Sequence, residues 1–146
     1  MNAAPATATP ASLGLRLLAA IYDLLPLLGL WFMAALLALV VTGGTLDVHR
    51  LADKLFVQFL VLAFSAVYFA VSWSRGGQTI GMKPWRLRVV RGDGMPVSPR
   101  HALLRFAVAL VSLAVLGAGF WWALFDPQKR AWHDIAAGTL VVRLSA

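Results

Sequence analysis

An apolar stretch over residues 16–42 constrains the fold more than any other feature of this sequence. Within it, residues 24–41 form a run of 18 residues without a charge. A helix needs about 17–25 mostly apolar residues to cross the hydrocarbon core of a bilayer, so this run is long enough. We therefore predict a membrane-spanning helix over residues 16–42.

The composition indicates the same class of protein. Of the 146 residues, 60% are hydrophobic and only 13% are charged, which is far from the balance of a soluble domain. Two further apolar segments, 54–73 and 102–125, are long enough to be spans. Beside these spans, the net charge of +7 indicates a lipid bilayer with anionic headgroups as the partner, and we expect no nucleic acid. The absence of cysteine excludes thiol nucleophiles and zinc-thiolate sites.

The predicted fold is an all-α membrane protein with three transmembrane helices, or four if the last apolar segment folds as two. Residues 1–12, rich in Pro, Ala and Thr, are expected to form a disordered tail before a single transmembrane domain over 13–146. Gly117 and Gly119 would allow the last segment to break or re-enter. Such a break would return the C-terminal tail to the side of the membrane that a simple three-span count denies it.

The loop over residues 74–101 carries most of the positive charge outside the spans. By the positive-inside rule it is cytoplasmic, and two preceding spans then place the N-terminus in the cytoplasm as well. Within the loop, WRLRVV, RGDG and MPVS are typical of a strand, a turn and a second short strand, which predicts a cytoplasmic β-hairpin. Three of the loop's basic residues are expected to contact lipid headgroups: Lys83, Arg86 and Arg88.

Two charges in the first span are the main functional signal. Arg16 and Asp23 are seven residues apart and therefore share a helix face, about 10 Å apart along the axis. A carboxylate at that depth costs at least ~2.5 kcal/mol, so Asp23 should face protein, water or a cation rather than lipid. Arg105, in the third span, is expected either to extend to the headgroups or to be a second cationic partner of Asp23.

The C-terminal segment contains a second acidic candidate, Asp134, next to His133. The pair is compatible with proton or metal chemistry, but a cap that orders the tail is the simpler interpretation. We expect no metal site, because no set of His and carboxylate residues shows ligand spacing. Residues 138–144, GTLVVRL, have strand character and are expected to pair with the predicted hairpin, which favours a cytoplasmic tail.

Four motifs in this order make the chain similar to the RDD family of small bacterial membrane proteins, named for one arginine and two aspartates. They are Arg16 and Asp23 in RLLAAIYD, the Gly-Gly-x-Thr-x-Gly segment of GGQTIG, the strand and glycine turn of LRVVRGDG, and Asp134 in HDIAAGTLVV. Many members place a basic residue directly after the last glycine of the second motif, whereas here Met82 precedes Lys83. The resemblance implies a multi-span helical domain in the bacterial inner membrane, with transport as the activity most often suggested.

Two functions from different classes follow. In the first, the protein supports cation or proton transport, with Asp23 as the titrating carboxylate and with Arg16 or Arg105 adjusting its charge. In the second, it is a non-transporting scaffold or accessory subunit in which Arg16, Asp23 and Asp134 form a buried polar lock. Both functions imply a homo-oligomer or a membrane partner protein. We expect no enzymatic activity and no cofactor, because no serine or histidine pairs with a base by spacing.

Overall fold

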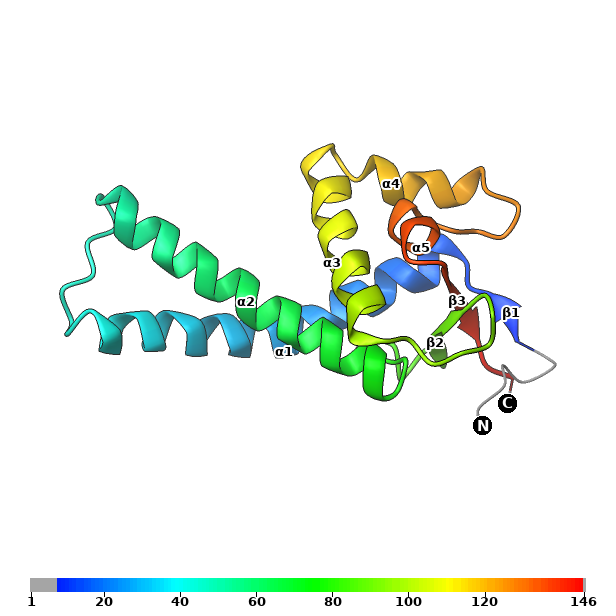
Figure 1. The fold of residues 1–146 in the computed structure, drawn as a ribbon, viewed down its shortest axis with the longest axis horizontal. Helices are drawn as coiled ribbons and strands as arrows, with labels where there is room; N and C mark the ends of the chain where they lie inside the picture. Colours follow the sequence, from blue (N-terminus) through cyan, green and yellow to red (C-terminus); the bar gives the residue numbers. More distant parts are fainter. Residues whose placement is uncertain (1–7, 146) are drawn as a thin grey trace. The chain divides into compact units, whose positions relative to one another are not determined.

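The computed structural model describes residues 8–145, which form two compact units. The first unit contains the chain up to Asp23 and from Phe69 onward, and the second contains Leu24–Tyr68. Two long helices, α1 (Leu13–Val41) and α2 (Leu51–Arg75), run through both units (Figure 1). Each is long and apolar enough to cross a membrane, which confirms the two predicted helices in this part of the chain.

The second unit is a pair of helical segments joined by a short loop. α1 ends before Thr42, whose hydroxyl donates a hydrogen bond of 2.9 Å to the Ala38 carbonyl. Gly43 and Gly44 then adopt positive φ angles of 62° and 81°, a conformation that glycine reaches without steric cost. Within this unit the indole of Trp31 donates to the Ser65 hydroxyl at 2.9 Å, so a polar group in each helix is satisfied inside the protein.

The third predicted span is broken. The expected continuous helix over 102–125 is wrong: α3 (Pro99–Ala114) and α4 (Ala118–Trp121), which a short 3-10 helix, η1 (Trp122–Leu124), continues, are bent by 108° relative to each other. Leu116 and Gly117 lie at the bend with φ angles of 58° and 74°, so the chain there leaves the right-handed helical region. The alternative of two short helices is confirmed. Together they would supply a third span if the bent pair counted as one.

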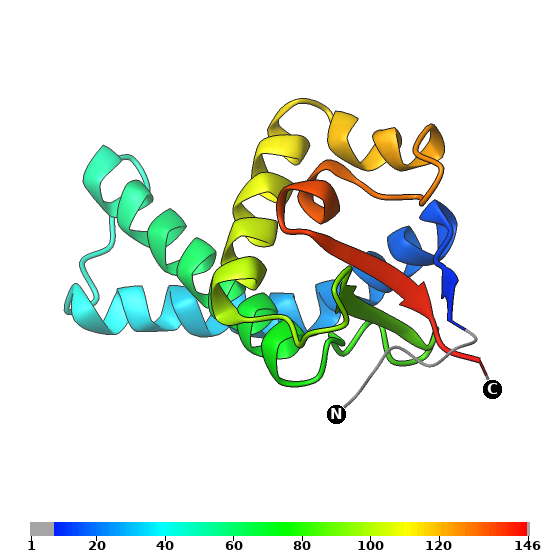
Figure 2. The same ribbon diagram turned by 45° about the vertical axis from the view of Figure 1, so that its right-hand side comes forward.

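A small antiparallel sheet belongs to the first unit, and its strands come from distant parts of the chain. β3 (Thr139–Arg143) lies between β1 (Thr9–Pro10) and β2 (Leu87–Arg91), as Figure 2 shows with β3 in red. The register pairs Val89 with Val141. The predicted local hairpin is therefore wrong, because residues 95–98 form no strand and β2 pairs with β3. The expected pairing of the C-terminal segment with this strand is confirmed.

The sheet also changes the expectation for the N-terminal tail. Residues 1–7 lie outside the described part of the chain, but Thr9 and Pro10 form β1, which corrects the expectation of disorder up to residue 12. Pro10 is tolerated there because β1 is an edge strand of the sheet. The backbone N–H of Ala11 donates to the carbonyl of Val141 at 2.9 Å, which continues the attachment up to the start of α1.

The inner face of the sheet forms part of the hydrophobic core of the first unit. Leu87 and Val89 alternate with arginines along β2 and are fully buried, because successive side chains of a strand point to opposite faces. The remaining buried members come from all parts of this unit: Ala11, Ala19, Trp73, Met82, Val97, Ala102 and Val141. This core fixes α1, α3, α5 (Trp132–Ala136) and the sheet around a set of buried charges.

Candidate functional site

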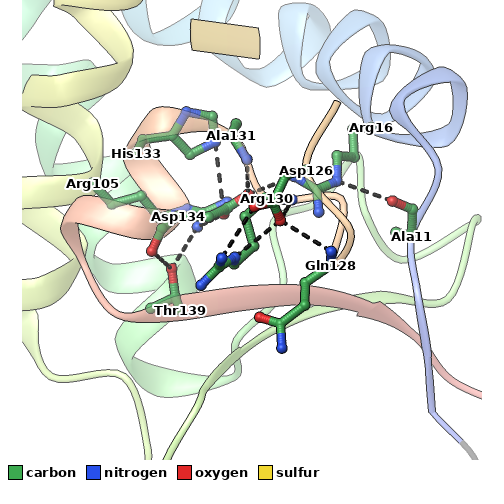
Figure 3. A network of polar contacts seen from close by, with 10 residues as sticks. All are labelled: Ala11, Arg16, Arg105, Asp126, Gln128, Arg130, Ala131, His133, Asp134 and Thr139. Atoms are coloured by element: carbon green, nitrogen blue, oxygen red, sulfur yellow. Dashed lines mark hydrogen bonds and ion pairs between the residues drawn. The ribbon is translucent and has the colours of Figure 1, made fainter. Parts of the chain in front are cut away.

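Asp134 lies at the centre of the buried polar network in the first unit (Figure 3). It belongs to the first turn of α5, its side chain is fully buried, and its Oδ2 accepts a 2.9 Å hydrogen bond from the backbone N–H of Ala131. This bond satisfies a donor at the start of the helix, as a capping carboxylate does. The interpretation of Asp134 as a cap that orders the tail is therefore confirmed.

Two arginines from different helices bind the two oxygens of this carboxylate. Arg16 of α1 donates from Nη1 to Oδ2 at 2.5 Å, and Arg105 of α3 donates from Nη1 to Oδ1. Only 9% of the Arg16 side chain and 4% of the Arg105 side chain are exposed, so both guanidinium groups are largely removed from water. The carboxylate thus joins α1, α3 and α5 through charge-assisted hydrogen bonds, which are the stronger kind.

Each arginine is also held by a second contact. Arg16 donates from Nε to the carbonyl of Ala11 at 3.3 Å, and Arg105 donates from Nη1 to Oγ1 of Thr139, the first residue of β3, at 2.8 Å. The guanidinium carbon of Arg105 lies 4.9 Å from the centroid of the Trp73 ring, within the range of a cation–π contact. These contacts connect the helices of the cluster to the sheet on either side.

His133 lies beside this cluster and is neutral at physiological pH. Burial lowers its pKa to about 3, and the nearby charge of Arg105 acts in the same direction. For Asp134, burial alone would raise the pKa, but Arg105, His133 and Arg16 outweigh it and hold the pKa of Asp134 well below its ordinary value. The network therefore contains one carboxylate and two guanidinium groups, with a net positive charge.

Asp23 takes part in a different contact. Its side chain is 4% exposed, and its carboxylate accepts hydrogen bonds from the Thr79 hydroxyl at 2.5 Å and from the backbone N–H of Gly81 at 2.8 Å. A Cβ at Gly81 would lie 2.7 Å from Cγ of Asp23 and would also meet the carbonyl of Ala19, so only glycine fits there. Asp23 thus fastens the segment after α2 to α1.

The structure therefore divides the predicted polar residues into two groups. It brings Arg16, Arg105 and Asp134 together, and it places Asp23 against Thr79 and Gly81. The expected partnership of Arg16 with the carboxylate one helical face away gives way to a tertiary one, because the guanidinium reaches a residue 118 positions later. Sequence spacing along one helix carries no information on such a contact.

The three residues expected at lipid headgroups lie outside both groups. Lys83 and Arg86 are exposed, and Arg88 is half-buried. Arg86 precedes β2 with a φ angle of 54°. The aliphatic part of Arg88 packs against Gly77, where an added Cβ would lie 3.0 Å from its Cγ.

Three features of the polar network were not found by sequence reasoning. Thr79 and Thr139 both lie in the motifs shared with the RDD pattern, so their position in those motifs was an available signal. Asp126 and Arg130 form a bidentate pair at 3.0 Å, and their spacing of four residues was a second signal. The hydrogen bonds from Arg130 lower the pKa of Asp126 to about 2. Within residues 8–145, no group of three His, Cys, Asp or Glu side chains is placed to hold a metal ion.

Comparison with known proteins gave one match. The model of the RDD family matches residues 10–138, which include α1, α2, the sheet residues of β2 and both aspartates of the two polar groups. The search of curated proteins and the search of solved structures gave no match. A match over this share of the sequence, together with helices apolar enough to cross a membrane, shows that the chain belongs to the RDD family of membrane proteins.

Proposed function

We propose that this chain is a non-transporting membrane module, a scaffold or accessory subunit, in which the arginine and the two aspartates act as a structural lock. The observation that supports this proposal most directly is the fully buried carboxylate of Asp134 between Arg16 and Arg105. Each of these side chains is engaged by groups from other elements, so it is used in holding the fold. A carboxylate that carries an ion or a proton must instead change its partners during the cycle.

The energetics of buried ion pairs fit this role. Removing two charges from water costs several kcal/mol per ion, so such pairs add little net stability compared with a well-packed apolar core. Breaking one pair, however, leaves an uncompensated buried charge and costs about 3–5 kcal/mol. The network around Asp134 therefore disfavours every arrangement in which α1, α3 and α5 are not brought together, and this is how a lock sets one arrangement.

The second polar group supports the same proposal. Asp23 fixes the segment containing Thr79 and Gly81 on α1 at the place where α2 has just ended. The sequence around Asp134 does the corresponding work at the other end of the first unit. In this view the motif residues assemble one interfacial domain, and the module acts with a membrane partner protein or with further copies of itself.

We propose a topology in which β1, β2 and β3 all lie on the cytoplasmic side of the bacterial inner membrane. β1 precedes α1, β2 follows α2 and β3 follows α4, yet the three strands share one sheet. A sheet with open edges is not stable in lipid, so its strands lie on one side of the bilayer. This supports two crossings by α1 and α2, with α3 and α4 entering and leaving on the same side. The basic residues near β2 support the cytoplasm as that side.

Cation or proton transport remains a second candidate, because Asp23 is buried in a helix that can span a membrane. Ion flux in liposomes under an imposed sodium or pH gradient distinguishes the two functions. For the module, we expect wild-type flux equal to that of protein-free liposomes and reduced membrane accumulation of both Asp23→Asn and Asp134→Asn. Flux that Asp23→Asn abolishes, while the variant remains folded and inserted, would refute our proposal and make Asp23 the working carboxylate.

A further inference from the structure

The basic segment after α2 carries positive charge that the fold leaves uncompensated. Residues 74–101 contain six basic residues and one acidic residue, Asp93. Asp93 forms an ion pair with Arg91 at 2.5 Å and is therefore already used. Within residues 8–145, neither Arg75 nor Lys83 forms an ion pair. Two unpaired cations that lie close together indicate a site for an anion.

These two cations line the same cavity. It has a volume of about 320 Å³, and its walls include Arg75, Lys83 and Gln78 together with the apolar side chains of Val71 and Ile80. The amide of Gln78 is held in place because its Nε2 donates to the carbonyl of Leu87 at 2.7 Å. Val71 is 41% exposed and Ile80 is 55% exposed, so apolar and cationic groups are presented side by side.

The cavity lies where a candidate membrane span ends. α2 has 25 residues and ends at Arg75. At 1.5 Å per residue it is about 37 Å long, which exceeds the ~30 Å hydrocarbon core, so its ends reach the headgroup region. A phosphate at this depth belongs to a lipid whose acyl chains lie on the hydrocarbon side, where exposed apolar side chains are favourable contacts.

We propose that this cavity binds the phosphate of an anionic phospholipid. Arg75 and Lys83 contact the phosphate, and Val71 and Ile80 contact the glycerol and the upper acyl chain. Arg88 adds positive charge nearby, since its side chain packs on Gly77, the neighbour of Gly76 in the cavity wall, and its Nε is buried without a hydrogen-bond partner. This inference is independent of whether the chain transports ions.

The ligand chemistry is a phosphate monoanion or diester, which a lipid or a soluble phosphate could supply. The apolar part of the cavity favours the lipid, because a free phosphate makes no use of Val71 and Ile80. The test therefore includes both sources. Purified full-length protein in neutral detergent is titrated with phosphatidylglycerol, with phosphatidylcholine and with inorganic phosphate, and bound lipid is counted by native mass spectrometry.

A matched pair of charge variants separates a defined site from diffuse attraction. Arg75→Gln/Lys83→Gln removes two positive charges at the cavity, and Arg100→Gln/Arg143→Gln removes two from exposed residues elsewhere in the same unit. At about one order of magnitude for two headgroup contacts, we expect phosphatidylglycerol to bind the cavity variant about tenfold more weakly. The control variant should bind within twofold of wild type, and Lys83→Arg, which keeps the charge, should bind like wild type.

Three results would overturn the inference. Equal weakening in both double variants would show that binding depends on net charge alone. Equal binding of phosphatidylcholine would show that the phosphate charge is not recognised. Displacement of phosphatidylglycerol by inorganic phosphate at an equal concentration would assign the site to a soluble phosphate. Size-exclusion elution at the wild-type volume establishes that each variant is folded before it is compared.

Discussion

Replacing Asp134 with asparagine is the sharpest test of the structural lock. The side chain keeps its shape, but the carboxylate between two guanidinium groups is lost, and those groups are only 9% and 4% exposed. Removing one partner of a buried ion pair costs about 3–5 kcal/mol, and here one carboxylate serves two partners. We therefore expect a loss of at least ~3 kcal/mol, which at 2–4 °C per kcal/mol lowers the unfolding temperature by roughly 6–12 °C.

The assay is thermal unfolding of the purified protein in detergent, followed by tryptophan fluorescence. Asp93→Asn is the matched control, because the same substitution there breaks a pair with Arg91 whose aspartate side chain is 51% exposed, and we expect little change. A third variant, Arg16→Met/Arg105→Met/Asp134→Leu, replaces the whole charged set by apolar side chains. It should regain most of the wild-type unfolding temperature, because a well-packed apolar cluster avoids the cost of removing charges from water.

The reasoning fails if Asp134→Asn unfolds within 2 °C (about the effect of 1 kcal/mol or less) of Asp93→Asn. That result would mean that Arg16 and Arg105 find water or another acceptor at little cost, so that Asp134 does not lock the helices. A triple variant less stable than Asp134→Asn would contradict the argument in a different way. It would show that packing around the guanidinium groups, rather than their charge, is what the cluster contributes.

Three further predictions follow from single features. The pKa of His133 is lowered to about 3 in the folded state, so stability should fall as the pH decreases from about 6.5 towards 3, by at most ~1.4 kcal/mol per pH unit, and His133→Gln should remove this part of the pH dependence in thermal unfolding. Gly81→Ala should lower the unfolding temperature, since overpacking costs about 1–3 kcal/mol, whereas Gly76→Ala, where the nearest atom is 4.0 Å from an added Cβ, should unfold like wild type. Because the chain has no cysteine, single substitutions at Gly94 and Arg143 can be labelled cleanly in sealed vesicles, and both should react from one side; labelling from opposite sides would exclude the proposed topology.

Much of the helical architecture could be predicted from local patterns. The spans around α1 and α2 are long apolar runs, and the pair of glycines after Thr42 is a local stop signal that the structure confirms. Strand character was also local, since Leu87 and Val89 alternate with arginines. What the pattern could not supply was the partner of β2, because hydrogen bonding between strands depends on segments about 50 residues apart, β2 and β3.

The break in the last apolar segment lies between these two cases. Gly117 made two short helices an alternative that could be stated, but the hydropathy of residues 102–125 does not change at the bend. Leu116, with a φ angle of 58°, is apolar and not typical of a bend. The core beneath α3, α4 and α5 decides the direction of the chain there, and a count of apolar residues does not contain that information.

The sequence by itself determined the membrane class, the two long helices and the identity of the charged residues that matter, because burying an arginine or an aspartate among apolar residues is costly wherever it occurs. The tertiary structure alone decided how those charges are paired. Arg16 and Asp23 share a helix face, yet Arg16 binds Asp134 and Asp23 binds Thr79 and Gly81. The physical reason is that an ion pair is selected by distance in the folded protein, and the sheet and core bring together residues 118 positions apart while the helix holds Arg16 and Asp23 about two turns apart.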